Sequence, residues 1–275
     1  TRRTVIAAAC AAAAMTFGPM SFAQQAPEKK DVTIAVGGKS LYYYLPLSIA
    51  EQLGYFKDEG LNVKIVDFQG GSRSLQAVVG GSADVVSGAF EHTISMQAKK
   101  QPMTAFVLQG RAPQLALVVS NKTMKDYKQL SDLKGKKVGV TAPGSSSQMV
   151  ANFILKKGGL GPKDVAFIFV GSSSGAVSAI RSGQIDALIN LDPVITILLK
   201  NGDAKLVADT RKVKESESFF GGTMPAGCLY APVSFIEKNP QTVQALTNAI
   251  VRADEWLSCL LYTSPSPETA ANLVC

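Results

Sequence analysis

Four turns rich in glycine and serine each follow a predicted strand and precede a predicted helix. Glycine lets the backbone approach a bound molecule closely, and serine supplies a small neutral hydrogen-bonding group. The N–H groups at the start of each helix would face the same crevice and favour negative charge there. A single turn of this kind more often only caps its helix, but four of them favour a shared binding cleft. The turns lie at residues 69–72, 87–90, 141–147 and 171–174.

Aromatic and charged residues also follow predicted strands. Tyr42 to Tyr44 precede Pro46, which is expected to start a helix. Some of these rings are expected to pack in the core, and at least one could form a flat wall of the cleft. Helix starts favour an anion, whereas Glu91 and Asp192 favour a cation or a hydrogen-bond donor, so the charge of the ligand stays open. Asp192 could instead cap the following helix, and Arg111 could form an ion pair where two lobes join.

Arrangements of residues typical of catalysis are missing from the sequence. The single histidine, His92, has no serine or cysteine in a nucleophile-elbow context, and a lone histidine at a helix start is more often a capped surface or cleft residue than a catalyst. No GxSxG, phosphate-binding loop or metal-ligand spacing occurs. The 28 Lys and Arg residues outnumber the 21 Asp and Glu residues, but they form no stripe interleaved with aromatic residues, which argues against nucleic acid.

The elements that must position these residues alternate along the chain. Short apolar, β-branched runs predict strands, and segments with helical periodicity lie between most of them. This alternation is typical of an α/β fold with a mostly parallel sheet covered on both faces. Strands are expected at residues 31–36, 63–68, 83–87, 103–108, 115–119, 137–141, 165–170 and 185–190, and helices at 47–53, 74–79, 93–99, 147–157, 175–181 and 193–200.

A length of 275 residues allows either one large core or two lobes. Two lobes are favoured because Ser74 to Val86 and Ser178 to Ile189 share one design, an amphipathic helix that ends in glycine, a small turn with Asp and a buried strand. Residues 31–112 and 225–257 are expected to form the first lobe, and residues 113–224 the second.

The two ends of the chain differ from the rest. Residues 1–23 combine Arg2 and Arg3, a short apolar run and the small-residue pattern before Ala23, which predicts a signal peptide cleaved after Ala23. An amphipathic helix is expected to end near Leu257. The segment that follows contains LLYTSPSP, which resembles translated adapter sequence, so residues 258–275 are interpreted as a non-native tail.

Three ordered blocks carry a resemblance to a known family. PLSIAEQLGYFKDEGLNVKIVDFQGGSRSLQAVVGGSADVV at residues 46–86, LSDLKGKKVGVTAPGSS at 130–146 and AIRSGQIDALINLDP at 179–193 resemble ABC-importer substrate-binding proteins of the nitrate/sulfonate/taurine type, which are related to thiamine-precursor-binding proteins. The resemblance implies a type II periplasmic-binding-protein fold: two α/β lobes, each a mixed, mostly parallel sheet flanked by helices, with the hinge crossed twice. Carried over by motif, the ligand contacts would be Ser40, Tyr42, Tyr43, Gly71, Ser72, Ser87, Ala89, Glu91, Thr141, Ser145, Ser146, Asn190 and Asp192.

The resemblance also implies a function. We expect a periplasmic, monomeric protein that closes on a small organic solute, of the sulfonate, carboxylate, nitrate-like or pyrimidine class, and delivers it to an ABC permease and its ATPase. No catalytic residue, metal or cofactor is expected. One alternative is an enzyme on the same fold, similar to the pyrimidine synthase of thiamine biosynthesis, although that family's CCCFC motif is missing here. The other alternative is a periplasmic sensing coreceptor.

Overall fold

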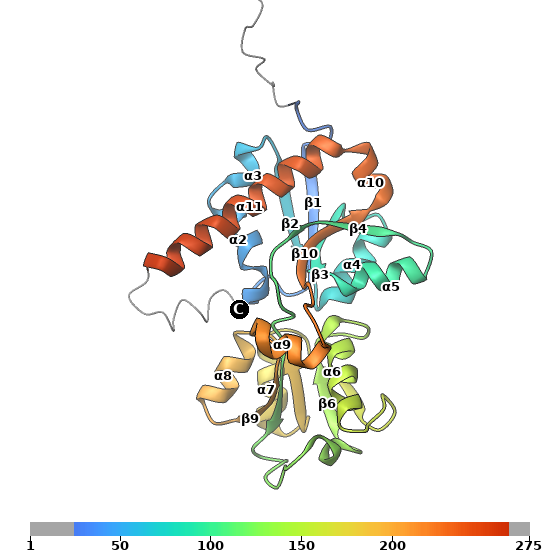
Figure 1. Cartoon of the computed structure of the whole chain (residues 1–275), viewed down its shortest axis with the longest axis vertical. Helices are drawn as coiled ribbons and strands as arrows, with labels where there is room; N and C mark the ends of the chain where they lie inside the picture. The colour runs from blue at the N-terminus through green and yellow to red at the C-terminus, as the bar shows by residue number, and fades with distance from the viewer. Residues whose placement is uncertain (1–24, 264–275) are drawn as a thin grey trace, which may run out of the picture.

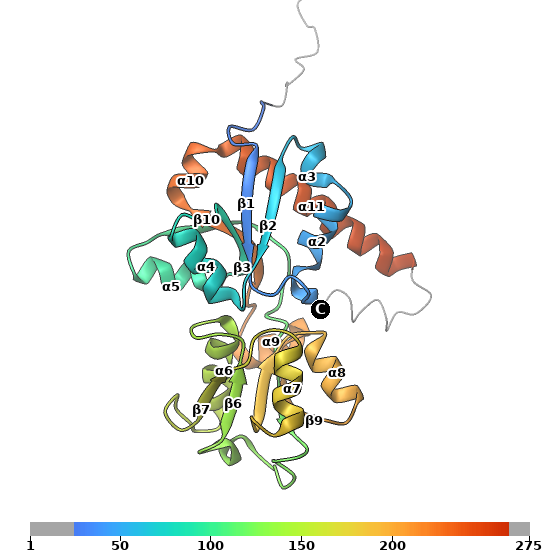
Figure 2. The ribbon, with the colours of Figure 1, turned by 180° about the vertical axis from the view of Figure 1, so that it is seen from behind.

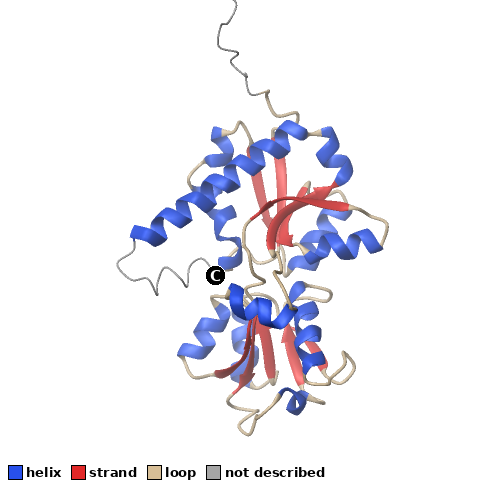
Figure 3. Ribbon diagram, in the orientation of Figure 1, coloured by secondary structure: helices blue, strands red, loops and turns tan. Residues whose placement is uncertain are grey.

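The computed structural model describes residues 25–263 of the chain. The expected signal peptide and residues 264–275 of the expected tail lie outside this part. Within residues 25–263 the strands form two sheets of five strands each. Each sheet has its own helices packed on it, and each sheet with its helices forms one lobe. The two lobes lie one above the other in Figure 1 and Figure 3. This is the predicted two-lobed α/β fold.

The first lobe is built on a mixed sheet in the order β2-β1-β3-β10-β4. Its strands are β1 (Asp31–Val36), β2 (Asn62–Asp67), β3 (Val85–Ala89), β4 (Met103–Leu108) and β10 (Gly227–Pro232). β1 runs parallel to β2 and β3, whereas β10 runs antiparallel to β3 and β4. The β-branched run of β1 suits this position, because Val32, Ile34 and Val36 are all buried.

The second lobe repeats the plan of the first, with the order β7-β6-β8-β5-β9. Its strands are β5 (Ala116–Ser120), β6 (Lys137–Val140), β7 (Ala166–Phe169), β8 (Ala187–Asn190) and β9 (Ala204–Asp209). The fourth strand of each sheet, β10 in the first and β5 in the second, runs antiparallel to both of its neighbours. Each of these strands is the first one that the chain forms after it arrives from the other lobe. The predicted repetition of a lobe plan is therefore confirmed.

Helices cover the sheets of both lobes. The first lobe carries the 3-10 turn η1 (Tyr42–Tyr44), α2 (Leu45–Gln52), α3 (Tyr55–Asp58), α4 (Gly71–Val79), α5 (Glu91–Ala98), α10 (Val233–Lys238) and α11 (Pro240–Thr263). The second lobe carries η2 (Leu130–Leu133), α6 (Ser146–Lys157), α7 (Ser174–Ser182), α8 (Val194–Lys200) and α9 (Val213–Phe220). Figure 2, the view from behind, shows α7 between β6 on one side and α8 on the other. None of the described helices combines the length and apolar character needed to cross a bilayer.

The chain passes between the lobes twice, from β4 to β5 and back from α9 to β10 (Figure 1). After the return, α11 packs on α2 and α3 through a stripe of buried residues that includes Leu246, Ala249 and Ile250. The prediction that this helix ends near Leu257 is wrong, because α11 continues to Thr263.

Candidate ligand-binding cleft

Loops from the two lobes meet in the middle of the molecule. The N–H of Tyr42 in the first lobe donates to the carbonyl oxygen of Asp192 in the second at 3.0 Å. The N–H of Ser72 donates to Oγ of Ser145 at 3.3 Å, and the two Oγ atoms are also 3.3 Å apart. Tyr42, Ser72 and Ser145 lie at the starts of helices, and Asp192 lies two residues after the end of β8. Such positions are expected to face a crevice in an α/β fold. The lobes are therefore in direct contact through these loops.

Glycine makes this close contact feasible. A Cβ at Gly70 would lie 2.7 Å from Cβ of Ala142 in the other lobe, and a Cβ at Gly38 would lie 2.4 Å from Oγ of Ser172. Real Cβ atoms do not approach other heavy atoms so closely. The serine- and glycine-rich turns predicted to face a cleft thus face each other across it.

A small cavity of about 20 Å³ remains between the lobes. It has room for about one water molecule. Five of the predicted ligand contacts line it, namely Tyr43, Gly71, Ala89, Thr141 and Ser146, and they come from both lobes. Gly37, Tyr44 and Leu191 complete the lining. Leu191 lies within the predicted stretch from Asn190 to Asp192, whereas Gly37 and Tyr44 were not predicted as contacts. Gly37 directly follows β1, so its position after a strand was the available signal.

Other predicted contacts are engaged in holding the loops. Oγ of Ser87 donates to Oε1 of Gln109 at 2.7 Å. The side chain of Asn190 donates from Nδ2 to the carbonyl of Gly171 at 3.3 Å and accepts the N–H of Leu191 at 2.8 Å. Ser72 and Ser145 bind each other across the cleft, as described above. Ser40 is exposed in the turn after β1.

Asp192 is occupied within the second lobe. Its Oδ1 accepts the N–H of Thr196 at 2.9 Å, which is the helix-capping contact considered from the sequence. Its Oδ2 lies 3.1 Å from Nη1 of Arg211, which also pairs with Asp209 at 2.8 Å. The interpretation of Arg111 as an ion-pair partner is wrong for the described part of the chain, because Arg111 pairs with no acidic residue there.

Removing the guanidinium of Arg211 should destabilise the second lobe. The hydrogen bonds from Arg211 lower the pKa of Asp209 although burial acts to raise it, and in Arg211→Met both carboxylates would be left without their cation. We expect a loss of about 2 kcal/mol in the free energy of unfolding, measured by urea denaturation at neutral pH. The matched change Arg181→Met breaks the Asp203 pair of a side chain that is 47% exposed, and should cost less than about 1 kcal/mol. Equal losses in the two variants would contradict this role of Arg211.

His92 is a core residue in this structure. It is buried, and its Nδ1 lies 2.9 Å from the hydroxyl of the fully buried Tyr230. Burial lowers the pKa of His92 to about 4, so the ring is neutral at physiological pH. The expected surface location is wrong, because the ring is buried. The ring does lie at the cleft: a Cβ at Gly71, which lines the central cavity, would be 3.2 Å from Cε1 of His92, and the backbone of Gly144 in the second lobe acts to raise the pKa of His92 against the effect of burial. Within the described residues no group of His, Cys, Asp and Glu side chains is arranged to hold a metal ion.

A larger pocket of about 480 Å³ opens beside Glu91. It is lined from the first lobe by Glu91 and from the second by α6 and by the chain that returns from α9. Its lining residues are Glu91, Met149, Val150, Phe153, Phe220, Gly221, Gly222, Thr223 and Met224. Glu91 is half-buried at the start of α5, and burial raises the pKa of its carboxyl to about 7. The pocket is thus an apolar hollow with one carboxyl group on its wall.

This raised pKa predicts a pH-dependent stability. The folded protein binds the Glu91 proton more tightly than the unfolded chain does, so the free energy of unfolding should fall as pH rises from about 4.5 to about 7. Glu91→Gln removes this loss. We expect the variant to be more stable than the parent by up to about 3 kcal/mol near pH 8, and equal to it near pH 4. Urea denaturation at both pH values measures the difference. The exposed Glu237→Gln should show no such dependence, and an identical profile for both variants would refute the role of burial.

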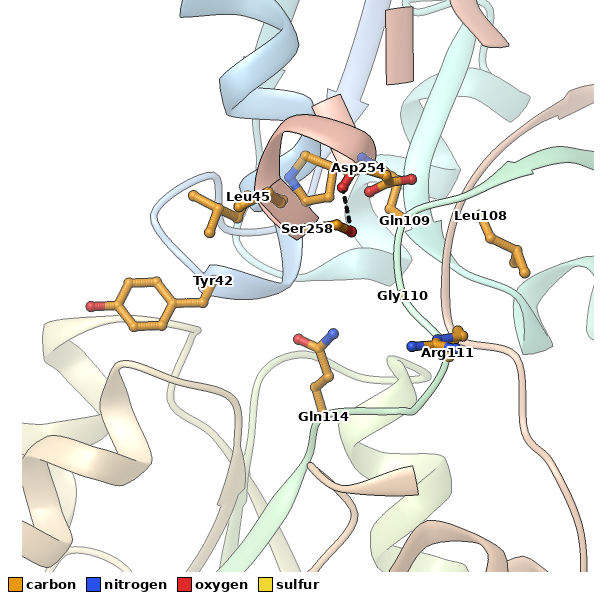
Figure 4. Close-up of a pocket in the computed structure, with 11 residues that line it drawn as sticks. Tyr42, Leu45, Leu108, Gln109, Gly110, Arg111, Gln114, Asp254 and Ser258 are labelled. Carbon is orange, nitrogen blue, oxygen red and sulfur yellow. Dashed lines mark hydrogen bonds between the residues drawn. The ribbon is translucent and has the colours of Figure 1, made fainter. Parts of the chain in front are cut away.

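A third pocket, of about 380 Å³, lies on the side of α11. Figure 4 shows that Tyr42, Gln114 and Arg111 surround its open space, with Asp254 and Ser258 above them. Burial raises the pKa of Asp254 to about 7. The predicted contact Tyr42 is 44% exposed and lines this pocket rather than the central cavity, whereas Tyr43 and Tyr44 are buried. The three tyrosines therefore divide between the two predicted environments: Tyr43 and Tyr44 are buried, and Tyr42 lies on the wall of a pocket.

The sequence profile of a family described as NMT1/THI5 like matches residues 42–258, which include every lining residue of the three pockets except Gly37. The chain belongs to the NMT1/THI5-like family.

Solved structures share the two-lobed fold of this NMT1/THI5-like protein. A Bordetella bronchiseptica structure is 59% identical, with a TM-score of 0.84, and the match covers 91% of this chain and 77% of that chain. The periplasmic nitrate-binding protein NrtA from Synechocystis PCC 6803 is 18% identical, with a TM-score of 0.70 and coverage of 85% and 63%. The alkanesulfonate-binding protein SsuA from Xanthomonas axonopodis pv. citri, bound to MOPS, is 21% identical, with a TM-score of 0.67 and coverage of 90% and 84%. At these identities NrtA and SsuA show the fold alone.

Curated relatives of this NMT1/THI5-like protein carry names of two kinds. YtlA of Bacillus subtilis, which is named as a binding protein, is 27% identical over 218 residues, or 78% of this chain and 63% of YtlA. The 4-amino-5-hydroxymethyl-2-methylpyrimidine phosphate synthase of Candida albicans is 24% identical over 233 residues, or 82% of this chain and 67% of the synthase. The chain thus spans about two thirds of the length of these relatives.

Proposed function

We propose that this protein is the periplasmic solute-binding component of an ABC importer, which captures a small organic solute between its lobes and delivers it to a membrane permease and its ATPase. The observation that carries the proposal is the contact between lobes: Tyr42 and Ser72 of one lobe donate to Asp192 and Ser145 of the other, around a cavity lined from both sides. A solute that touches both lobes binds only the closed form tightly, and therefore shifts the molecule toward that form.

The size of the cavity requires the lobes to separate during binding. A space of about 20 Å³ holds no organic solute. The solute therefore enters when the Ser72 and Ser145 contact is broken, and it either enlarges the cavity or occupies the pocket beside Glu91. To move an open-to-closed equilibrium from 1:99 to 99:1, the solute must favour the closed form by about 5.5 kcal/mol.

The second candidate is an enzyme that forms a pyrimidine. One observation favours it: a relative that aligns with 82% of this chain is named as a pyrimidine phosphate synthase. Against it stands the state of His92, which is neutral, has its Nδ1 2.9 Å from the hydroxyl of Tyr230 and is not itself a lining residue of the three pockets. We therefore place the binding function first.

A thermal-shift screen tests the proposed function. The protein is screened against sulfonates, carboxylates, nitrate, pyrimidines and organic amines. A solute present at about 100 times its dissociation constant should add about 2.7 kcal/mol of stability. The same solute should make the molecule more compact in X-ray scattering, and mass spectrometry should recover it unaltered. A solute that is converted to a product would favour the enzyme instead. The absence of any binding solute in all five classes would refute the proposal.

A further inference from the structure

The pocket beside Glu91 carries information on the charge of the ligand that the sequence leaves open. Two carboxylates were candidates for binding a cation, and the structure separates them. Asp192 is engaged with Thr196 and Arg211. No ion pair or hydrogen bond from another described residue reaches the carboxyl of Glu91, although burial removes much of its water. A desolvated carboxylate without a partner is costly, and a cation bound beside it would remove that cost.

In the described part of the chain, positive side chains line neither the central cavity nor the Glu91 pocket, although Arg111 lines the third pocket. Lys157 on α6 lies next to the pocket without lining it: its Nζ donates to the carbonyl of Ser218 at 3.2 Å and lies 4.8 Å from the ring centre of Phe219 and 5.7 Å from that of Phe153. The helix starts that face the cleft contribute only about half a positive charge each. Above about pH 7, where the Glu91 carboxyl is ionised, an anion in this pocket would therefore meet a negative charge with no Lys or Arg in the lining to offset it.

The walls of the pocket suit an organic body. Phe153 and Phe220 are tilted against each other with ring centres 4.9 Å apart, and Met149 and Met224 line the same hollow. Aromatic faces attract cations, and thioethers adapt to apolar or aromatic groups of irregular shape. The volume of about 480 Å³ is in the range of small-molecule sites. Because Glu91 belongs to the first lobe and Phe153 to the second, one solute would contact both.

We propose that the Glu91 pocket selects a small organic cation, an ammonium or amidinium group attached to an apolar or aromatic body, in preference to neutral and anionic solutes of the same shape. The cation would lie against the Glu91 carboxylate, and the body would lie between Phe153, Phe220 and Met224. This inference rests on the proposed function, since it concerns the solute on which the lobes close.

Three probes of similar shape test this selectivity: phenethylammonium, 3-phenylpropan-1-ol and 2-phenylethanesulfonate. Their dissociation constants are measured by calorimetry with the parent protein, Glu91→Gln and the control Glu237→Gln, whose carboxyl is exposed on α10. We expect the parent to prefer phenethylammonium, and Glu91→Gln to lose at least about tenfold in affinity for it, as for one lost charge-assisted hydrogen bond. Affinity for the alcohol should be unchanged in Glu91→Gln, and all three affinities should be unchanged in Glu237→Gln.

The pH dependence gives a second measurement. Tyr43, Tyr44, Cys228 and Tyr230 share the electrostatic environment of Glu91, and burial raises the pKa of each of them, that of Cys228 to about 12. His92 stays neutral above about pH 4. Of these groups only Glu91 titrates between about pH 6 and 8, so affinity for phenethylammonium should rise with pH and binding near pH 7 should release protons. Both effects should vanish in Glu91→Gln.

The outcomes separate this inference from the proposed function. If the sulfonate or the alcohol binds as tightly as phenethylammonium and compacts the molecule, or if Glu91→Gln leaves the ammonium affinity unchanged, the cation inference is wrong while the solute-binding function stands. If none of the probes and no member of the thermal-shift panel binds, both are wrong.

Discussion

Gly37→Ala should destabilise the protein by about 3 kcal/mol, the upper end of the usual cost of overpacking. Gly37 connects β1 to the turn before η1. A Cβ at this position would lie 2.4 Å from the backbone nitrogen of Gly71 and 2.5 Å from the carbonyl carbon of Gly70. These are main-chain atoms at the start of α4, so they cannot yield as a flexible side chain would. Urea denaturation measures the loss.

A matched glycine provides the control for Gly37→Ala. Gly222 lies on the chain returning from α9, and a Cβ there would meet no atom within 4 Å. Neither Gly37 nor Gly222 has a positive φ, so in both positions the added methyl group tests space rather than backbone strain. Gly222→Ala should change the free energy of unfolding by less than about 0.5 kcal/mol. If Gly37→Ala proves as stable as Gly222→Ala, the close approach of β1 and α4 is not as described.

Ala142→Leu should prevent the lobes from closing and weaken solute binding by about a hundredfold or more. Ala142 is buried against Gly70 of the other lobe, where even one added methyl on the glycine would lie 2.7 Å from it. The larger side chain would have to push the lobes apart. A closed form that costs a further 3 kcal/mol or so lowers the apparent affinity by about two powers of ten. Calorimetry with the solute found in the thermal-shift screen measures the change.

The same substitution at an exposed site is the control for Ala142→Leu. Ala166 is exposed on β7, and Ala166→Leu should leave solute affinity and compaction unchanged. The Ala142→Leu protein should keep the parent's far-ultraviolet circular dichroism, because the added bulk faces the other lobe. It should also fail to become compact in X-ray scattering when the solute is added. Normal compaction and affinity in Ala142→Leu would show that closure does not bring Ala142 against Gly70.

Local pattern predicted most of the elements that carry the cleft. The β-branched run at β1 and the apolar runs at β4 and β6 are strands in the structure, with ends within one residue of those predicted. β3 begins at Val85, two residues later than predicted, because Asp84 uses its carboxylate to accept the N–H of Thr33 on the neighbouring strand. That contact joins residues 51 positions apart in the chain, beyond the reach of a local pattern.

The sequence analysis missed β9, β10 and α9. β10 contains Gly, Cys and Pro, and it forms a strand only because β3 and β4 pair with it on both sides. Its position in the first sheet depends on the return of the chain after more than one hundred residues in the second lobe. The strand propensity of a segment does not show whether a distant part of the chain will pair with it. For the same reason the sequence did not predict the contact between Asp192 and Arg211.

From the sequence alone came the α/β class, the repeated lobe plan and the turns that face the cleft, because strand propensity, helix periodicity and glycine conformations act over a few neighbouring residues. Only the tertiary structure decided which carboxylate is engaged and which has no ion-pair or hydrogen-bond partner from another of residues 25–263. Asp192 and Glu91 both follow strands, yet folding brings Arg211 to the first and an apolar wall from α6 and the chain after α9 to the second. Two charges stabilise each other only when they are close in space. Residues that are far apart in the chain come close only when the lobes fold, so local sequence cannot show which carboxylate gains a partner.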